Sequence, residues 1–209
     1  LFSSTVIFEF DRNKDLKLDA EELEMVGSVI LESLAEFDYF QFVTADGKVT
    51  VVAEGDIAAN GVMLSRDGKL LYVSNEDTAG VSILDLATEK IVASLPTGEE
   101  PEGVKMSPNG KFVMATSEDA GMVYKIDTAT AKVVSSMKVG RRPRTIAWMP
   151  DNVRAFVNAE NDGTVVYIDA DKNTILETIQ LGEAGVVKPM GVLLSPDNAK
   201  LYVTTGRGK

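Results

Sequence analysis

The chain of 209 residues contains neither cysteine nor histidine. Their absence excludes thiolate and imidazole metal sites, cysteine nucleophiles, Ser-His-Asp catalysis and the usual haem ligands. Any bound metal ion must therefore have oxygen ligands. No apolar run approaches the roughly 18 residues that a membrane-spanning helix needs. We expect no haem cofactor and no membrane span.

Basic residues are also scarce. The chain has 21 Lys and Arg against 32 Asp and Glu, which gives a formal net charge of -11. Nucleic-acid binding depends largely on neutralising phosphates with Lys and Arg. The charge balance therefore argues against a nucleic-acid partner.

A sequence repeat begins near Gly61 and continues to the C-terminal end. Gly61, Gly103, Thr145 and Gly191 start equivalent segments, at spacings of 42, 42 and 46 residues. Each unit has four short apolar runs separated by turn residues, which indicates four strands. A period of this length predicts the blade of a β-propeller.

The sequence therefore predicts a mainly β fold with two parts. Residues 54–209 would form a partial β-propeller of four-stranded blades, three complete and one partial. Residues 1–53, which are strongly acidic, would form a small α-helical module with an EF-hand-like loop.

That loop spans residues 11–22 and has the spacing of an EF-hand. Its oxygen ligands would be Asp11, Asn13, Asp15, the backbone carbonyl of Lys17, Asp19 and Glu22. A helix over residues 23–37 would follow, because apolar residues recur there at steps of three and four. Leu16 stands where Gly is normal, and a positive φ costs a Leu about 1 kcal/mol or more. Two interpretations stay open: a site for Ca²⁺ or a lanthanide, and a loop that only caps the helix.

Repeat position also indicates which residues meet around the central channel. In a propeller, the connections between blades and those from the second to the third strand open on one face, where functional residues usually lie. Those connections carry a set of charged residues, the candidate binding residues of the chain: Glu76, Glu102, Glu118, Arg142, Arg144 and Glu160, with Lys188 nearby.

Two interpretations of this charged rim stay open. It could be a docking surface or a pocket for a small polar ligand, with Arg142 and Arg144 holding a carboxylate through paired hydrogen bonds. Alternatively, the Glu and Arg loops pair with one another in solvent and contribute little to stability. No catalytic residue is predicted.

Several motifs carry a resemblance to a known family. They are Leu71-Tyr-Val-Ser-Asn-Glu, Gly98-Glu-Glu-Pro-Glu-Gly-Val, Gly140-Arg-Arg-Pro-Arg and Ser195-Pro-Asp-Asn-Ala-Lys-Leu-Tyr-Val. Residues 56–209 resemble YVTN-type β-propellers, most closely the periplasmic propeller associated with PQQ-dependent alcohol catabolism. The resemblance implies a periplasmic or extracellular location and a quinoprotein dehydrogenase as partner. It also implies a ring of about seven blades, completed by a longer chain, by self-association or by another chain.

The same resemblance bears on PQQ itself. Quinone-binding dehydrogenases pack repeated tryptophans, and this chain has a single Trp. We therefore expect that PQQ is not bound directly.

The N-terminal part resembles a second family. Leu1-Phe-Ser-Ser, Phe8-Glu-Phe-Asp, Glu36-Phe-Asp-Tyr-Phe and Asp46-Gly-Lys look like the central part of the DUF1007 family over residues 1–53. Those are exported bacterial proteins associated with metal-ion transport. The His-Pro-His start of that family is missing here.

Together these features predict a non-catalytic periplasmic propeller that binds a protein partner or a small polar ligand, accessory to PQQ-dependent alcohol oxidation, with Ca²⁺ or a lanthanide at the N-terminal loop. Two alternatives remain: a propeller hydrolase of the lactonase type, and a structural or adhesive repeat protein of the cell surface.

Overall fold

The computed structural model describes residues 59–206 except Asp77, together with the backbone of four strands before them. The four N-terminal strands are β1 (Ser4–Thr5), β2 (Ser28–Leu31), β3 (Tyr39–Val43) and β4 (Val49–Glu54), and they form one sheet in this order. The EF-hand-like loop at residues 11–22 lies outside the described residues.

Three four-stranded antiparallel sheets follow, as the repeat predicts. Blade 1 contains β5 (Ala59–Leu64), β6 (Leu70–Asn75), β7 (Gly80–Asp85) and β8 (Lys90–Pro96). Blade 2 contains β9 (Pro101–Met106), β10 (Phe112–Ser117), β11 (Met122–Asp127) and β12 (Lys132–Lys138). Blade 3 contains β13 (Pro143–Trp148), β14 (Arg154–Ala159), β15 (Thr164–Asp169) and β16 (Thr174–Gln180), with the 3₁₀ helix η1 (Glu160–Asp162) after β14.

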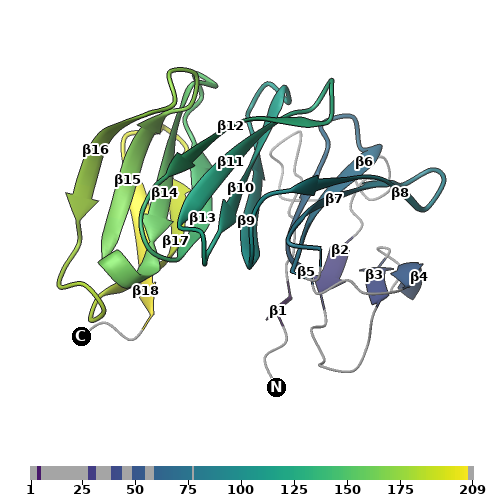
Figure 1. Ribbon diagram of the computed structural model, residues 1–209, viewed down its shortest axis with the longest axis horizontal. Coiled ribbons are helices and arrows are strands. Elements are labelled where there is room, and N and C mark those ends of the chain that lie inside the picture. The colour runs from purple at the N-terminus through teal and green to yellow at the C-terminus, as the bar shows by residue number, and fades with distance from the viewer. Residues whose placement is uncertain are drawn as a thin grey trace.

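A half-blade of two strands, β17 (Lys188–Leu194) and β18 (Leu201–Gly206), completes the described chain. The sheets follow one another as a fan, and the first strand of each contacts the first strand of the next (Figure 1). The prediction of a mainly β fold with four-stranded, propeller-like blades is confirmed.

The N-terminal strands differ from the sequence prediction. Ser28–Leu31, inside the helix predicted over residues 23–37, forms strand β2 instead. Strands β2, β3 and β4 begin at residues 28, 39 and 49, which is 42, 41 and 41 residues before the starts of β6, β7 and β8. The blade repeat therefore extends to the N-terminal side of Gly61. The short apolar run Val29-Ile30-Leu31 fits both periods, and strand pairing with β3 decides between them.

The hairpins between the third and fourth strands have a common construction. Asp85 ends β7 and its carboxylate accepts the backbone N–H of Thr88 at 2.8 Å, while Glu89 takes a φ of 56°. Asp127 and Asp169 accept the equivalent N–H groups at 2.8 Å. These aspartates are turn residues because each bonds its own loop.

Two hydrophobic layers hold the blades together. Tyr72 and Ile83 of blade 1 pack with Val104 and Val113 of blade 2, and a second layer joins blades 2 and 3. Trp148 lies in this second layer with 7% of its surface exposed, and its indole N–H donates to the carbonyl of Lys105 at 3.1 Å. The single tryptophan is therefore a core residue, and it bridges two blades.

Candidate functional site: a charged cluster and cleft on the rim

The site is built on hydrogen bonds that join the first strands of neighbouring blades. In blade 2, the N–H of Gly103 donates to Thr116 Oγ1 at 2.8 Å, and that hydroxyl donates to the carbonyl of Arg144 in blade 3 at 3.1 Å. Ser74 of blade 1 and Asn158 of blade 3 make the equivalent links. This inter-blade relay fixes the spacing of the first strands, and with it the positions of Glu102 and Arg144.

The loops above the first strands are tied down in the same way. The backbone N–H groups of Glu118 and Glu160 donate to the carbonyls of Glu100 and Arg142, each at 2.9 Å. Glu100 and Arg142 occupy equivalent repeat positions, and both have a left-handed φ, of 48° and 58°. Non-glycine residues rarely adopt that conformation, so the loop geometry is imposed by its surroundings.

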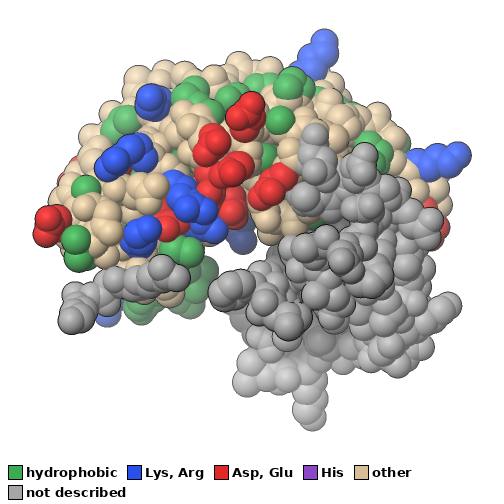
Figure 2. All heavy atoms as spheres, turned by 60° about the horizontal axis from the view of Figure 1, so that its bottom comes forward, with side chains coloured by type: hydrophobic (Ala, Val, Ile, Leu, Met, Phe, Trp, Pro, Cys, Tyr) green, Lys and Arg blue, Asp and Glu red, His purple; other side chains and the backbone are tan. Residues whose placement is uncertain are grey.

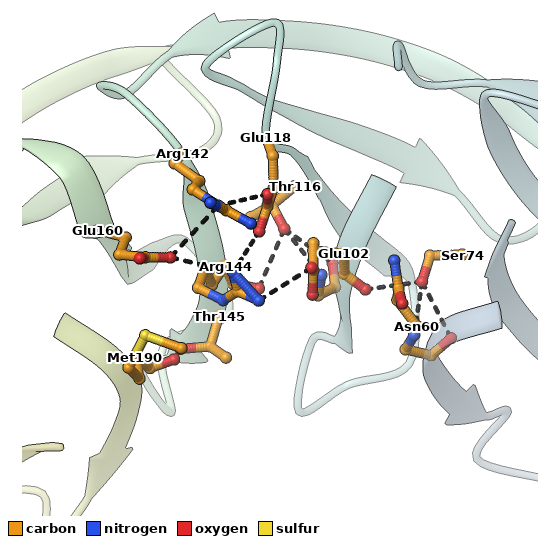
Figure 3. A network of polar contacts seen from close by, with 12 residues as sticks. Asn60, Ser74, Glu102, Thr116, Glu118, Arg142, Arg144, Thr145, Glu160 and Met190 are labelled. Atoms are coloured by element: carbon orange, nitrogen blue, oxygen red, sulfur yellow. Dashed lines mark hydrogen bonds and ion pairs between the residues drawn. The ribbon is translucent and has the colours of Figure 1, made fainter. Parts of the chain in front are cut away.

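Arg144 is the centre of the cluster. Its guanidinium group lies 2.5 Å from Glu118 Oε1, 3.0 Å from Glu160 Oε2 and 3.1 Å from Glu102 Oε1. Strand β9, the connection after β10 and the 3₁₀ helix η1 thus each place a carboxylate beside one cation (Figure 3).

A second arginine closes the cluster. Arg142 Nε forms ion pairs with Glu118 Oε2 at 2.6 Å and Glu160 Oε2 at 3.4 Å, and Lys188 Nζ lies 3.4 Å from Glu160 Oε1. We call Glu102, Glu118, Arg142, Arg144, Glu160 and Lys188 the rim cluster. It holds three acidic and three basic side chains.

Burial makes this cluster different from a solvated surface network. The side chains of Glu118 and Glu160 are only 2% and 7% exposed. Burial, together with a hydrogen bond to Glu102 and the charge of that carboxylate, raises the pKa of Glu118 to about 7, against the opposing effect of Arg144 and Arg142. Although burial of Arg142 acts to lower its pKa, the Glu118 and Glu160 carboxylates raise it overall. Glu118 therefore gains or loses its proton near neutral pH.

The structure shows how the predicted residues of the rim are paired. Five of the six candidates, all but Glu76, meet in one place, so repeat position predicted their convergence correctly. They pair with one another, as the second interpretation predicts, but Glu118 and Glu160 are buried rather than exposed to solvent. Both arginines that were expected to hold a ligand carboxylate are already engaged by protein carboxylates.

Glu76 lies apart from the rim cluster. It accepts a hydrogen bond from the amide of Asn60 and is exposed. Asn60 occupies the repeat position of Glu102 and Arg144, so blade 1 provides no cation there. Glu76 therefore belongs to the exposed acidic surface next to the cluster.

A cleft adjoins the cluster. It has a volume of about 280 Å³, and its lining includes the acidic residues Glu100, Glu118 and Asp119 and the basic residues Lys138, Arg141 and Arg142. Figure 2 shows acidic and basic side chains side by side on this face. Lys138 was not among the predicted residues. The sequence signal that could have identified Lys138 is its charge, because the residues that end the other outer strands, Pro96 and Gln180, are uncharged.

Metal binding by the described residues is not supported by their geometry. Across residues 59–206 without Asp77, no group of three or more acidic side chains converges closely enough to hold an ion. In the same part of the chain, no helix has the length and apolar character needed to cross a bilayer.

Comparisons with known proteins concern the fold. A family model described as a YNCE-like β-propeller matches residues 25–155, which is more than half of the chain and begins inside the segment that resembles DUF1007. No curated protein matches the chain.

The solved structures to which the chain is similar include the following two. Hydrazine synthase of Kuenenia stuttgartiensis matches with a TM-score of 0.65 and 23% identity, over 72% of this chain and 43% of that chain. A chain in the Mitotic Checkpoint Complex matches with a TM-score of 0.70 and 19% identity, over 87% of this chain and 53% of that chain. This chain thus spans about half the length of these proteins, and the low identities relate them by fold alone.

Proposed function

Because the chain belongs to the family of YNCE-like β-propellers, we propose that it is a non-catalytic binding protein that recognises a protein partner through its charged rim. The proposed location is the periplasm, and the proposed partner is a quinoprotein alcohol dehydrogenase. Location and partner rest on the resemblance to the propeller of PQQ-dependent alcohol catabolism. A protein partner is also supported by the fact that one of the structurally similar chains belongs to a protein complex.

The observation that carries the proposal is the internal pairing of the rim cluster. Its charges neutralise one another, so the cluster fixes the loops without offering a free arginine. Around it lie exposed charges in two groups. Glu76, Glu99, Glu100 and Asp119 form an acidic side on blades 1 and 2, and Arg141 forms part of a basic side towards blade 3.

This arrangement suits recognition. Exposed charges on fixed loops lose little conformational freedom on binding, which favours affinity. Adjacent acidic and basic areas orient a partner of complementary charge and speed its association. The backbone bonds of Glu118 and Glu160 to the loops that carry Glu100 and Arg142 are the physical means of this preorganisation.

The test is binding of the purified chain to a purified quinoprotein alcohol dehydrogenase from the same source, measured by biolayer interferometry at low and at high salt. Association should be strong at low salt and weaken as ions screen the rim. Charge reversals Glu100→Lys and Arg141→Glu should slow association at least fivefold. The control Lys90→Glu, on outer strand β8, should leave it unchanged. No association, or equal loss in the control, would refute the proposal.

For the N-terminal loop we propose Ca²⁺ binding, with a lanthanide as the alternative ion. The proposal rests on the ligand pattern Asp11, Asn13, Asp15, Asp19 and Glu22 of the sequence. Calorimetric titration with Ca²⁺ and then La³⁺ should show binding in the native chain that Asp15→Ala abolishes. Heat that is identical in native and mutant protein would place the ion elsewhere. No heat would mean that Leu16 prevents binding.

One observation favours the hydrolase alternative, namely the pKa of Glu118 near 7, which suits a general acid or base. Against it, the Glu118 side chain is 2% exposed and its two carboxylate oxygens are paired with Arg142 and Arg144, so little of it is accessible to a substrate in the cleft. A lactone hydrolysis assay decides: turnover by the native chain that is lost in Glu160→Gln and Glu118→Gln would favour the enzyme. The binding proposal expects no turnover.

A further inference from the structure

The cleft beside the rim cluster has charges that the protein itself does not neutralise. Among the described residues, the side chains of Glu100, Asp119 and Lys138 take part in no ion pair or hydrogen bond, whereas Arg141 is paired with Asp162. The cleft therefore differs from the rim cluster, where every charge has a partner.

The two free carboxylates lie close together. The charge of Asp119 is the largest cause that raises the pKa of Glu100, and Glu118 adds to it. Two carboxylates that repel each other at an open cleft favour a ligand cation between them. Because no acidic side chains converge tightly enough for a metal ion in the described range, a larger organic ammonium group fits better.

Lys138 offers the opposite charge. Its side chain runs past Gly121, where the Cε atom lies 3.9 Å from the position that a Cβ would occupy. Gly121 and Gly140 are both part of the lining, and they leave it without side chains that would fill the space. Lys138 thus supplies an ammonium group without a protein partner among the described residues to a cleft that is also lined by Glu100 and Asp119.

The combination occurs once in the repeat. The residues equivalent to Lys138 are Pro96 and Gln180, and those equivalent to Glu100 are Ala58, Arg142 and Lys188. A structural role in blade packing would be expected at every repeat. Among the three complete blades, only blade 2 therefore combines an acidic residue at the position of Glu100 with a lysine at the position of Lys138.

From these observations we infer that the cleft binds a small zwitterion of the size of a free amino acid, with its ammonium group against Glu100 and Asp119 and its carboxylate against Lys138. The cleft volume of about 280 Å³ lies just below the range of pockets for larger ligands, which starts at roughly 300 Å³. The inference rests on the proposed binding function, since it names a ligand of the same rim. A bound zwitterion would pair with the acidic and the basic side chains of the cleft at the same time.

The test is calorimetric titration with L-alanine, L-lysine and L-glutamate. For the tightest binder, the methyl ester keeps only the ammonium group and the N-acetyl form keeps only the carboxylate. Each blocked form should bind at least tenfold more weakly than the free amino acid. Equal binding of the ester would overturn the inference, because it would make the cleft an ammonium site alone. Absence of binding by all three amino acids would also overturn it.

Variants locate the site. Asp119→Asn and Lys138→Met should each weaken binding at least fivefold, since each removes one charged contact. Glu177→Gln and Lys90→Met, which change exposed residues on outer strands β16 and β8, should bind as the native chain does. An equal effect of the control variants would refute the location.

Association with the dehydrogenase, measured on the same variants, keeps the two proposals separate. Loss of zwitterion binding in Lys138→Met with unchanged dehydrogenase association would support both. Salt-dependent association without any amino-acid binding would refute the zwitterion alone.

Discussion

Glu118 makes the stability of this protein depend on pH in a range where few other side chains titrate. Burial and the neighbouring Glu102 raise the pKa of Glu118 to about 7, from an ordinary value of 4.5. The folded state therefore binds a proton more tightly than the unfolded state. Stability from this group is fully present below about pH 4.5 and is lost as the pH rises towards 7, with a slope of at most about 1.4 kcal/mol per pH unit.

The window is unusually clear because the chain has no histidine. Several aspartates have pKa values below the ordinary 3.8, through hydrogen bonds in their turns and pairing with cations, and their contribution is lost only when the pH falls through that range: Asp67, Asp85, Asp127, Asp151, Asp162, Asp169 and Asp197. Glu100 shifts in the same direction as Glu118, but it is exposed and its effect is small.

The perturbation is Glu118→Gln, which keeps the shape of the protonated carboxyl and cannot lose a proton. Urea unfolding, followed by the fluorescence of the buried Trp148, gives the free energy of unfolding at pH 5 and pH 8. The free energy of unfolding of the variant minus that of the native chain should be about 2–3 kcal/mol larger at pH 8 than at pH 5.

The control is Glu160→Gln, at the same repeat position and similarly buried, which should keep the native slope. Parallel curves for the native chain and Glu118→Gln would refute the reasoning. They would mean that Glu118 is ionised in the folded state throughout this range.

Three further predictions use the same unfolding assay. Arg144→Met removes the cation that three carboxylates contact and should lower the free energy of unfolding by about 3–5 kcal/mol. A cost near zero would mean that solvent screens the charges of the rim cluster. Gly103→Ala places a Cβ 2.0 Å from the carbonyl of Arg144 and should cost about 2–3 kcal/mol. Gly191→Ala meets only the Thr204 hydroxyl, at 2.9 Å, and should cost less than about 1 kcal/mol, so equal costs would contradict the close approach of the first strands. Lys125→Met breaks a buried link, because Lys125 Nζ lies 2.7 Å from Asp171 of the next blade, and should cost about 1–3 kcal/mol; Lys132→Met, on an exposed strand, should be neutral.

Much of the fold follows from the repeat. The 42-residue spacing placed Glu118 and Glu160 at one position and Glu102 and Arg144 at another, and in a propeller equivalent positions share a face. That is why sequence alone could predict that these side chains meet. The N-terminal strands could be found in the same register, but the acidic EF-hand-like pattern and the helical spacing of residues 23–37 favoured another interpretation.

The details of the site depend on differences between repeats, which periodicity does not show. Glu76 shares the repeat position of Glu118, yet it faces Asn60 instead of an arginine and stays outside the cluster. Burial also comes from neighbouring blades, so the raised pKa of Glu118 could not be read from its own sequence context. Lys138 was not predicted because the equivalent residues of the other blades are uncharged, so a pattern common to all repeats does not include it.

The inter-blade relay has a consequence for how such a protein diversifies after duplication of a blade. The same joint is made by Ser74, Thr116 and Asn158, three side chains that have in common only a short reach, an acceptor and a donor. Attachment to the neighbouring unit therefore makes few demands on sequence, and none on the charged loops above it. A new copy can join its neighbouring blade through this relay, while mutation changes the charged residues of the rim independently.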